Sequence, residues 1–502
     1  MRWDFRRVLL TGCALLMTVP LAGAETMTKG GPVLESREFG RATAVAVGSP
    51  LRVVKVKAPD AGQDEAFQLE RFDVFAPGAK VTLHGRNGAR VVDAPRNAYF
   101  RGAVEGRPDS RVFLTLREDG SAQGVVTDAE DTWLIGGDDV PAKALGAAPL
   151  EMRRVEPVLL KSSRGDGFEC EQDQLPDAPP SYKSAEPGKD LTGAGFTEPL
   201  AGLSEAATAL YSARVAVETD YEFYAKFNNV TNATNYVGNL IGYASTLYTA
   251  ELRTSLLVQS VSLWTSPSDP WNQTTSMCGL MEFGRYWNVN KQGVSRTIAH
   301  FLSGRTTGGG VAWVGALCGG PFDAGASCTG IPTDAPWGGG YGFTANIKGT
   351  FNISSPTVMW DILAVSHEIG HNFNSPHTHC YGGIGGNASP IDSCYTGECG
   401  NRGCACGTAA LPGPAGARTG TIMSYCHLTR NSYTDVALNF GTTHPYGVQP
   451  AREAARMNAY IDQVAASNPS CLALTAGAPL TSAIFSSGFE DGTPADWTAK
   501  TP

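Results

Sequence analysis

The chain has little charge, no internal repeat and, beyond its first two dozen residues, no long apolar run. Charged residues make up 17% of the 502 residues, and the formal net charge is −9. An acidic balance argues against a nucleic-acid partner, and the lack of a further run of about 20 apolar residues argues against a membrane span. No DxDxDG calcium loop is present, although an acidic surface can still hold Ca²⁺.

The first 24 residues read as a signal peptide. Three arginines precede an apolar stretch from Val8 to Leu21, and Ala22-Gly23-Ala24 follows as an AxA cleavage site. We therefore expect a protein that is secreted to the periplasm or the extracellular medium, where disulfides can form.

Counting the cysteines singles one of them out. Of twelve cysteines, Cys13 leaves with the signal peptide, ten lie between Cys278 and Cys471, and Cys170 stands alone upstream. Ten cysteines can form five disulfides, although the pairing cannot be deduced from the sequence. Four of the ten cluster at positions 394, 399, 404 and 406. In an exported protein, disulfides are a better interpretation of this cluster than a second metal site.

Three histidines and a glutamate form an HExxHxxNxxH pattern from His367 to His377. Apolar residues at spacings of three and four predict a helix from Pro356 onward, which Ser354 or Ser355 can cap. On a helix His367 and His371 project to the same side, as two zinc ligands must. An asparagine three residues after His371 tolerates the left-handed turn that ends the helix and returns the chain for a third ligand. The ligands predicted from this pattern are His367, His371 and His377.

This donor set predicts a catalytic rather than a structural zinc site. Three neutral histidines leave one tetrahedral position open to water, whose pKa zinc lowers to about 7. Glu368 lies beside the metal without binding it, and we expect it to act as the general base. The alternative is a chance HExxH on a surface helix.

Downstream, Gly420-Thr421-Ile422-Met423-Ser424-Tyr425-Cys426 matches the methionine turn that follows this zinc motif in metzincins. Together with residues 366–380, 420–428 and 300–319, the turn resembles bacterial, secreted members of the reprolysin/adamalysin group of metzincins. One departure is Asn374, where the family has glycine.

The resemblance implies that Met423 forms an apolar floor beneath the histidines. In related metzincins a tyrosine at the position of Tyr425 assists catalysis, and we expect this hydroxyl to stabilise the transition state, or else to be a packed aromatic.

Composition and pattern divide the rest of the chain. Residues 25–170 predict a β-rich module with a hairpin at Asp119-Gly120; it resembles a reprolysin-type prodomain, and an independent binding module is the alternative. Residues 171–207 are rich in proline and glycine and predict a linker with the maturation site. Residues 208–475 would form the metzincin catalytic domain, and 476–502 a C-terminal tail.

Cys170 stands just before that linker. An unpaired thiolate can occupy the open zinc position of a zymogen and exclude water. We therefore expect Cys170 to act as a cysteine switch; a surface thiol or one internal to the prodomain is the alternative. His379, two residues past the third histidine, is expected to be exposed; the alternative is that it supports a zinc ligand from behind.

The predicted fold class is α/β (α+β): a twisted, mostly parallel sheet with a zinc-binding helix, preceded by the β-rich prodomain. The elements expected in it are strands over 213–220, 256–265 and 309–317 and helices over 235–252 and 450–464. By the resemblance, the strand over 309–317 is the edge strand that binds the substrate backbone.

These observations predict a monomeric, secreted zinc metalloendopeptidase, made as a zymogen, that acts on protein or peptide substrates. One alternative is a zinc amidase or esterase acting on a non-protein substrate by the same chemistry. The other is a non-catalytic binding module on a metzincin fold, which would have no use for a general base at Glu368.

Overall fold

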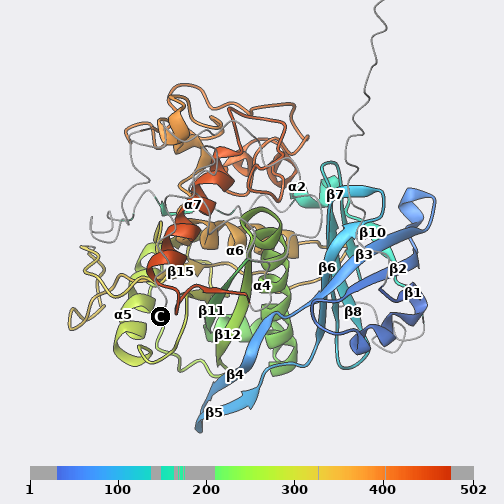
Figure 1. Ribbon diagram of the computed structural model, residues 1–502. Coiled ribbons are helices and arrows are strands. Elements are labelled where there is room, and N and C mark those ends of the chain that lie inside the picture. Colours follow the sequence, from blue (N-terminus) through green and yellow to red (C-terminus); the bar gives the residue numbers. More distant parts are fainter. Residues whose placement is uncertain are drawn as a thin grey trace, which may run out of the picture.

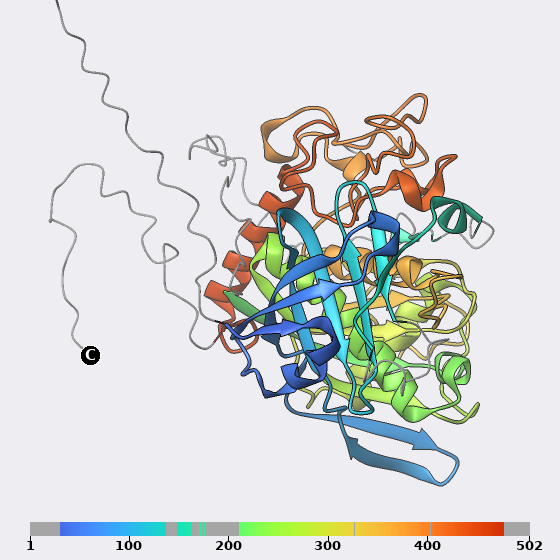
Figure 2. The same ribbon diagram turned by 90° about the vertical axis from the view of Figure 1, so that its right-hand side faces the viewer.

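The computed structural model describes residues 31–136, 148–162, 168, 170–172, 175, 210–325, 327–401 and 403–475. The predicted signal peptide, most of the linker and the C-terminal tail lie outside these residues. Two β-sheets flank a long central helix, and both are visible in Figures 1 and 2. No helix of the described residues is long and apolar enough to cross a membrane.

The first sheet comes from the N-terminal part of the chain, with strand order β1-β2-β3-β6-β7-β8-β9-β10. The expected hairpin joins β7 to β8, and Gly120 takes the left-handed conformation at its turn (φ 81°). All neighbours in this sheet are antiparallel except β1 and β2. The strands are β1 (Val33–Glu35), β2 (Pro50–Val56), β3 (Glu65–Phe72), β6 (Ala98–Val104), β7 (Arg107–Leu116), β8 (Ala122–Thr127), β9 (Thr132–Ile135) and β10 (Met152–Arg154).

The second sheet has the order β14-β15-β13-β11-β12-β4-β5, and β16 pairs with β11. Strands β4, β12, β11, β13 and β15 run parallel, while β5, β14 and β16 are antiparallel to their neighbours. The mixed, mostly parallel sheet is confirmed. Its strands are β4 (Phe75–Gly85), β5 (Gly88–Asp93), β11 (Tyr211–Thr219), β12 (Thr254–Trp264), β13 (Ile298–Leu302), β14 (Gly310–Ala312), β15 (Tyr341–Thr344) and β16 (Ala473–Leu474).

Most expected elements of the catalytic part are present, with bounds shifted by a few residues. The exception is the strand expected over 309–317, of which only the three residues of β14 are strand, at the sheet edge. The α-helices are α2 (Pro157–Ser162), α3 (Tyr221–Phe227), α4 (Val230–Leu252), α5 (Ser276–Asn290), α6 (Val358–Asn372) and α7 (Arg452–Ser467). Short 3₁₀ helices are η1 (Ser36–Ala44), η2 (Pro59–Ala61), η5 (Thr378–Cys380), η6 (Ile384–Gly386), η7 (Cys426–Leu428) and η8 (Ser432–Asp435).

Helix α4 is the centre of the molecule. From Ala233 to Leu252 every residue except Ala250 is buried, whereas a surface helix keeps one polar face in water. The helix is covered all round because it packs on β12 on one side and on β6 and β7 on the other.

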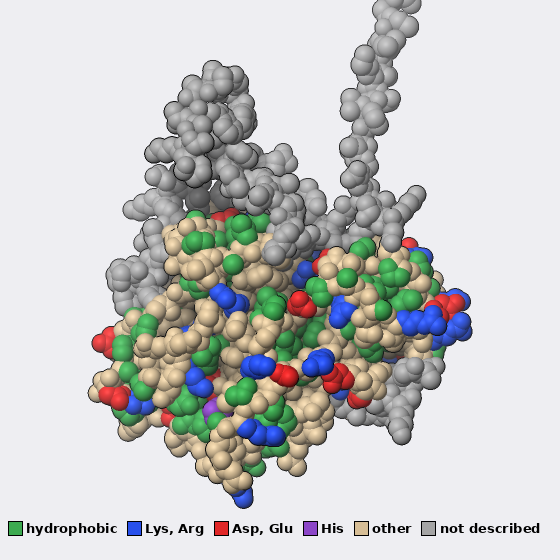
Figure 3. Space-filling model, turned by 60° about the horizontal axis from the view of Figure 1, so that its bottom comes forward, with side chains coloured by type: hydrophobic (Ala, Val, Ile, Leu, Met, Phe, Trp, Pro, Cys, Tyr) green, Lys and Arg blue, Asp and Glu red, His purple; other side chains and the backbone are tan. Residues whose placement is uncertain are grey.

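Five disulfides link ten cysteines, as the count predicted, and Cys170 is free and buried. The pairs are Cys278–Cys328, Cys318–Cys471, Cys380–Cys404, Cys394–Cys426 and Cys399–Cys406. The four clustered cysteines therefore all form disulfides. On the molecular face shown in Figure 3, acidic and basic side chains are interspersed.

Candidate active site

Helix α6 carries the first two histidines, and all of its residues are buried. It begins at Val358, and its N-cap is Thr357, which makes no side-chain cap hydrogen bond. The prediction that Ser354 or Ser355 caps the helix was therefore wrong. The chain reverses at Asn374 with φ 76°, the left-handed conformation that the sequence predicted. This turn returns the chain so that His377 faces the helix.

The three histidine rings gather at one point, with centroids 4.8 to 5.3 Å apart. His367 donates through Nδ1 to the carbonyl oxygen of Ile422 at 2.7 Å, and His371 donates to that of Ser375 at 2.7 Å. These bonds fix the tautomers and leave the Nε2 atoms as lone-pair donors. The Nε2 atom of His367 is buried without a hydrogen-bond partner among the described residues.

Met423 of the methionine turn is fully buried. Its sulfur packs against Gly370 of α6 so closely that a Cβ atom at that glycine would lie 2.4 Å from it. The glycine inside the HExxH motif therefore lets the methionine turn approach the zinc helix. The role of Met423 as an apolar floor beneath the histidines stays a prediction.

Glu368 is also fully buried, on the side of α6 that faces the edge strand. Its Oε1 atom has no hydrogen-bond partner among the described residues, and a Cβ at Gly310 of β14 would lie 2.3 Å from it. Burial raises the pKa of the Glu368 carboxyl well above its ordinary value, because desolvation disfavours the charged form. A raised pKa makes the carboxylate a stronger base.

The segment around Cys170 lies across this site. The thiol sulfur is 3.3 Å from His371 Nε2 and 3.7 Å from Glu368 Oε2. Its backbone forms a parallel bridge to Gly310, and Glu171 N donates to Gly310 O at 2.8 Å. The Tyr425 hydroxyl donates to the carbonyl oxygen of Cys170. The free thiol of Cys170 thus lies beside the histidines, and the Tyr425 hydroxyl binds the backbone of the same residue.

Two further residues of the site were not predicted from the sequence. His427 donates to the carbonyl oxygen of Phe168 at 2.7 Å, and the Phe168 ring packs edge-on against His367. Glu398 accepts from His377 Nδ1 at 2.8 Å and from His379 Nε2 at 3.0 Å through the same oxygen. The expectation that His379 is exposed was wrong, since its exposed fraction is 0%.

The residues present fit a zinc ion. The donor atoms of Cys170, His367, His371 and His377 all lie within 4.8 Å of one another, and ligands of tetrahedral zinc stand roughly 3.3–3.8 Å apart. Burial lowers the pKa of His367 well below its ordinary value and that of His371 to about 3, so both rings are neutral donors. Burial, and next the charge of Glu368, raise the pKa of the Cys170 thiol; a divalent cation reverses this, because a coordinating thiol is deprotonated.

Glu398 is expected to orient His377 for metal binding. The Nδ1 atom of His377 donates to the charged Glu398 side chain, whereas His367 and His371 donate to backbone carbonyl oxygens. In the sequence, Glu398 is surrounded by the disulfide-bonded residues Cys394, Cys399 and Cys404. We predict that Glu398→Gln weakens zinc binding roughly 10- to 100-fold, measured by competition with a chromogenic chelator.

Asp435 provides the control for this substitution. Its carboxylate is fully buried and accepts from Gly416 N and Thr429 Oγ1 rather than from a histidine. Asp435→Asn should leave zinc affinity unchanged. Equal zinc affinity in wild type and Glu398→Gln would contradict the orienting role.

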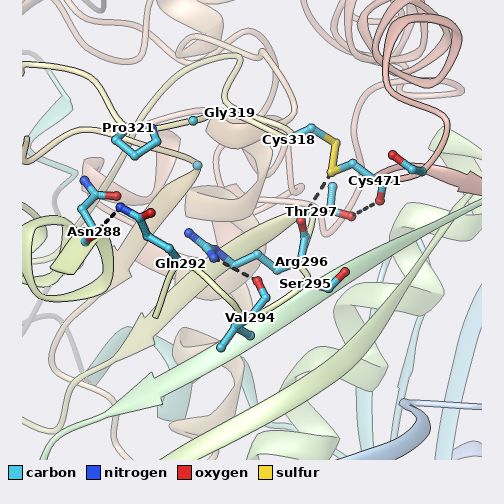
Figure 4. Close-up of a pocket in the computed structure, with 13 residues that line it drawn as sticks. Asn288, Gln292, Val294, Ser295, Arg296, Thr297, Cys318, Gly319, Pro321 and Cys471 are labelled. Carbon is cyan, nitrogen blue, oxygen red and sulfur yellow. Dashed lines mark hydrogen bonds between the residues drawn. A yellow bond between two sulfur atoms is a disulfide. The ribbon is translucent and has the colours of Figure 1, made fainter. Parts of the chain in front are cut away.

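A separate cavity of about 460 Å³ lies around the Cys318–Cys471 disulfide and Arg296 (Figure 4). None of its lining residues belongs to the candidate site. The Arg296 guanidinium donates hydrogen bonds to the carbonyl oxygens of Lys291 and Val294 and to the Tyr341 hydroxyl.

Comparison with known protein families identifies the domain that carries this site. The model of the metallo-peptidase family M12, reprolysin type, matches residues 210–434. The chain therefore carries a reprolysin-like domain of a metallopeptidase family; it is a peptidase, and the family implies zinc. The match does not imply calcium.

Solved structures similar to the chain include metalloproteinase-II from Bacteroides fragilis, at 10% identity and a TM-score of 0.32, covering 69% of this chain and 88% of that one. Another is a structure of a chaperone-substrate complex, at 11% identity and a TM-score of 0.27, covering 50% of this chain and 38% of that one. The search of curated proteins finds no match.

Proposed function

We propose that the protein is a secreted zinc endopeptidase made as a zymogen, which cleaves protein or peptide substrates laid along β14. The observation that carries this proposal is the convergence of His367, His371, His377 and the free thiol of Cys170 on one buried point. The family match supports the peptidase activity. Five disulfides, together with the signal-like N-terminus, support export.

In this proposal, His367, His371 and His377 hold zinc, which would supply Lewis-acid polarisation of the scissile carbonyl. Glu368 takes the proton of the attacking water and passes it to the leaving amine. Tyr425 donates its hydroxyl to the carbonyl oxygen as negative charge develops there. In the uncut chain that hydroxyl already binds a peptide carbonyl, the one of Cys170, which supports its role as a donor to the substrate.

The zymogen part of the proposal rests on what occupies the site. Cys170 lies next to His371 and Glu368, and its segment uses the backbone of Gly310 that a substrate strand would use. Its exposed fraction is only 4%. Cys170 therefore blocks both the metal and the edge strand, and a peptide bond reaches Glu368 only after this segment leaves.

Metal removal tests the proposal. Protein freed of the Cys170 segment by proteolysis should cleave casein, and a chelator such as 1,10-phenanthroline should abolish that cleavage because the histidines alone cannot polarise the carbonyl. Addition of one equivalent of Zn²⁺ should restore cleavage. Activity that survives complete removal of zinc, confirmed by elemental analysis, would contradict the mechanism, and a zinc-loaded protein that cleaves small esters but no protein would contradict the substrate class.

A further inference from the structure

The N-terminal module, defined here as residues 31–136 and 148–162, is built into the sheet of the peptidase domain. Strand β4 of the module pairs in parallel with β12, from Lys80–Ser260 to His84–Trp264. The ring of His84 stacks on that of Trp264 with centroids 4.2 Å apart. Strand β12 is therefore an interior strand, and removal of the module would turn it into an unpaired edge.

The strands of the module divide their side chains between two cores. Along β7, Val112 and Leu114 face a core that belongs to the module alone, while Phe113 joins the core of the peptidase domain. This alternation follows from the two-residue period of a strand. Because both faces of β7 are covered, the module and α4 share one continuous apolar core rather than a surface contact.

Glycines of α4 bring the two parts together. A Cβ atom at Gly238 would lie 2.6 Å from the Tyr99 hydroxyl, and one at Gly242 would lie 2.6 Å from the Phe113 ring and 3.0 Å from Val74. Only a helix without side chains at these two positions permits this approach.

Polar groups across the same interface are paired with one another. Asn239 Nδ2 donates to Gln123 at 2.9 Å, and Thr115 donates to the other end of the Asn239 amide at 2.7 Å. Arg418 of the peptidase domain donates to Thr132 at 2.7 Å. Further pairs join Asn97 to Asn235, Arg101 to Thr249 and Thr127 to Tyr243. Separation of the module would break all of these hydrogen bonds together.

We propose that the face formed by α4 and β12 is a lasting binding surface for the N-terminal module, which stays bound as a separate chain after the linker is cut. The partner is thus the cleaved N-terminal fragment of the same protein. The interface has the continuous apolar core and the paired polar groups of an obligate subunit contact. The mature enzyme is a two-chain complex.

This arrangement changes which cut releases the site, a consequence that rests on the proposed zymogen. Helix α2 belongs to the module and packs against η8, and Leu160 lies in the shared core. Phe168 follows Ser162 by only six positions. A cut in the linker beyond residue 175 therefore leaves Cys170 tethered beside His371 at an effective concentration in the millimolar range. A second cut, between Ser162 and Phe168, is needed to release the segment.

The test uses the full chain with recognition sites for a specific protease placed within residues 181–190, within residues 163–167, or in both. After the linker cut alone, both fragments should elute together in size-exclusion chromatography at micromolar concentration, and activity should stay roughly tenfold or more below that of the doubly cut protein. After both cuts the N-terminal fragment should still co-elute. Its elution as a separate folded species after either cut would overturn the proposal.

A matched pair of variants assigns retention to this interface. Gly242→Leu places a side chain against Phe113 and should weaken retention of the cut fragment roughly tenfold or more. Gly293→Leu has no atom within 4 Å of its Cβ position and should change nothing. Equal retention in both variants would overturn the assigned surface. If no cut form cleaves casein, the proposed function fails, yet the elution profiles still decide whether the module is retained.

Discussion

Glu368→Gln is expected to reduce cleavage of casein by about 10²- to 10⁴-fold, the usual contribution of a general base. Glutamine has the shape of glutamate but cannot take a proton from water. In the structure Glu368 is fully buried, its Oε1 atom is without a hydrogen-bond partner among the described residues, and burial raises the pKa of the carboxyl. The raised pKa makes the carboxylate form of Glu368 a stronger base than a carboxylate in water.

The measurement compares doubly cut wild type and Glu368→Gln for zinc content and for the rate of casein cleavage. Both proteins should hold one equivalent of zinc, because the ligands are unchanged. Glu218→Gln is the matched control: Glu218 is equally buried, but accepts hydrogen bonds from the indole nitrogens of Trp264 and Trp287. A Glu368→Gln protein that keeps its zinc and wild-type activity would show that the base is another residue.

The parts of the site that could be predicted from the sequence are those encoded by short spacings. His367 and His371 are four residues apart on a helix, and Asn374 reverses the chain within the next turn, so local geometry alone brings the histidines together. The methionine turn was recognised by its motif. The parity of the cysteines separated Cys170 from the ten that pair.

The parts that could not be predicted depend on contacts between distant residues. Glu398 reaches His377 from a loop whose path is set by disulfide pairing, and no periodicity encodes that pairing. His379 was expected to be exposed, but the same carboxylate binds it in the interior. One signal was available: Glu398 stands in the middle of the cysteine cluster, where the chain is most constrained.

The shared sheet was missed for a related reason. Residues 75–93 fall within the predicted β-rich module, and nothing in their pattern shows that β4 pairs with β12, about 180 positions further along the chain. A clue lay in α4, where asparagine, glycine and threonine recur on one face of an otherwise apolar helix. A face this polar would be predicted to be exposed to solvent, but here its side chains form hydrogen bonds with residues of the N-terminal module.

Cys170→Ser is expected to make the uncut chain roughly tenfold or more active than the uncut wild type. The expected reason is that serine oxygen is a far weaker zinc ligand than thiolate, so the tethered segment loses the bond that excludes water and substrate. The backbone contacts of the segment to Gly310 and Tyr425 remain in the variant, so activation should be partial. Casein cleavage by uncut protein, with proteolysis of the linker monitored by mass spectrometry, measures the effect.

Thiol labelling provides a readout that does not depend on activity. With all other cysteines of the described residues in disulfides, Cys170 is the one free thiol there, and it is buried against His371. In uncut wild type it should resist a maleimide, and removal of zinc should accelerate labelling because the metal–sulfur bond is lost. After both cuts, wild type and Cys170→Ser should be equally active. If the uncut Cys170→Ser variant is as inactive as uncut wild type while the cut forms are active, the prediction is wrong. In that case the backbone of the segment, and not the thiol, blocks the active site.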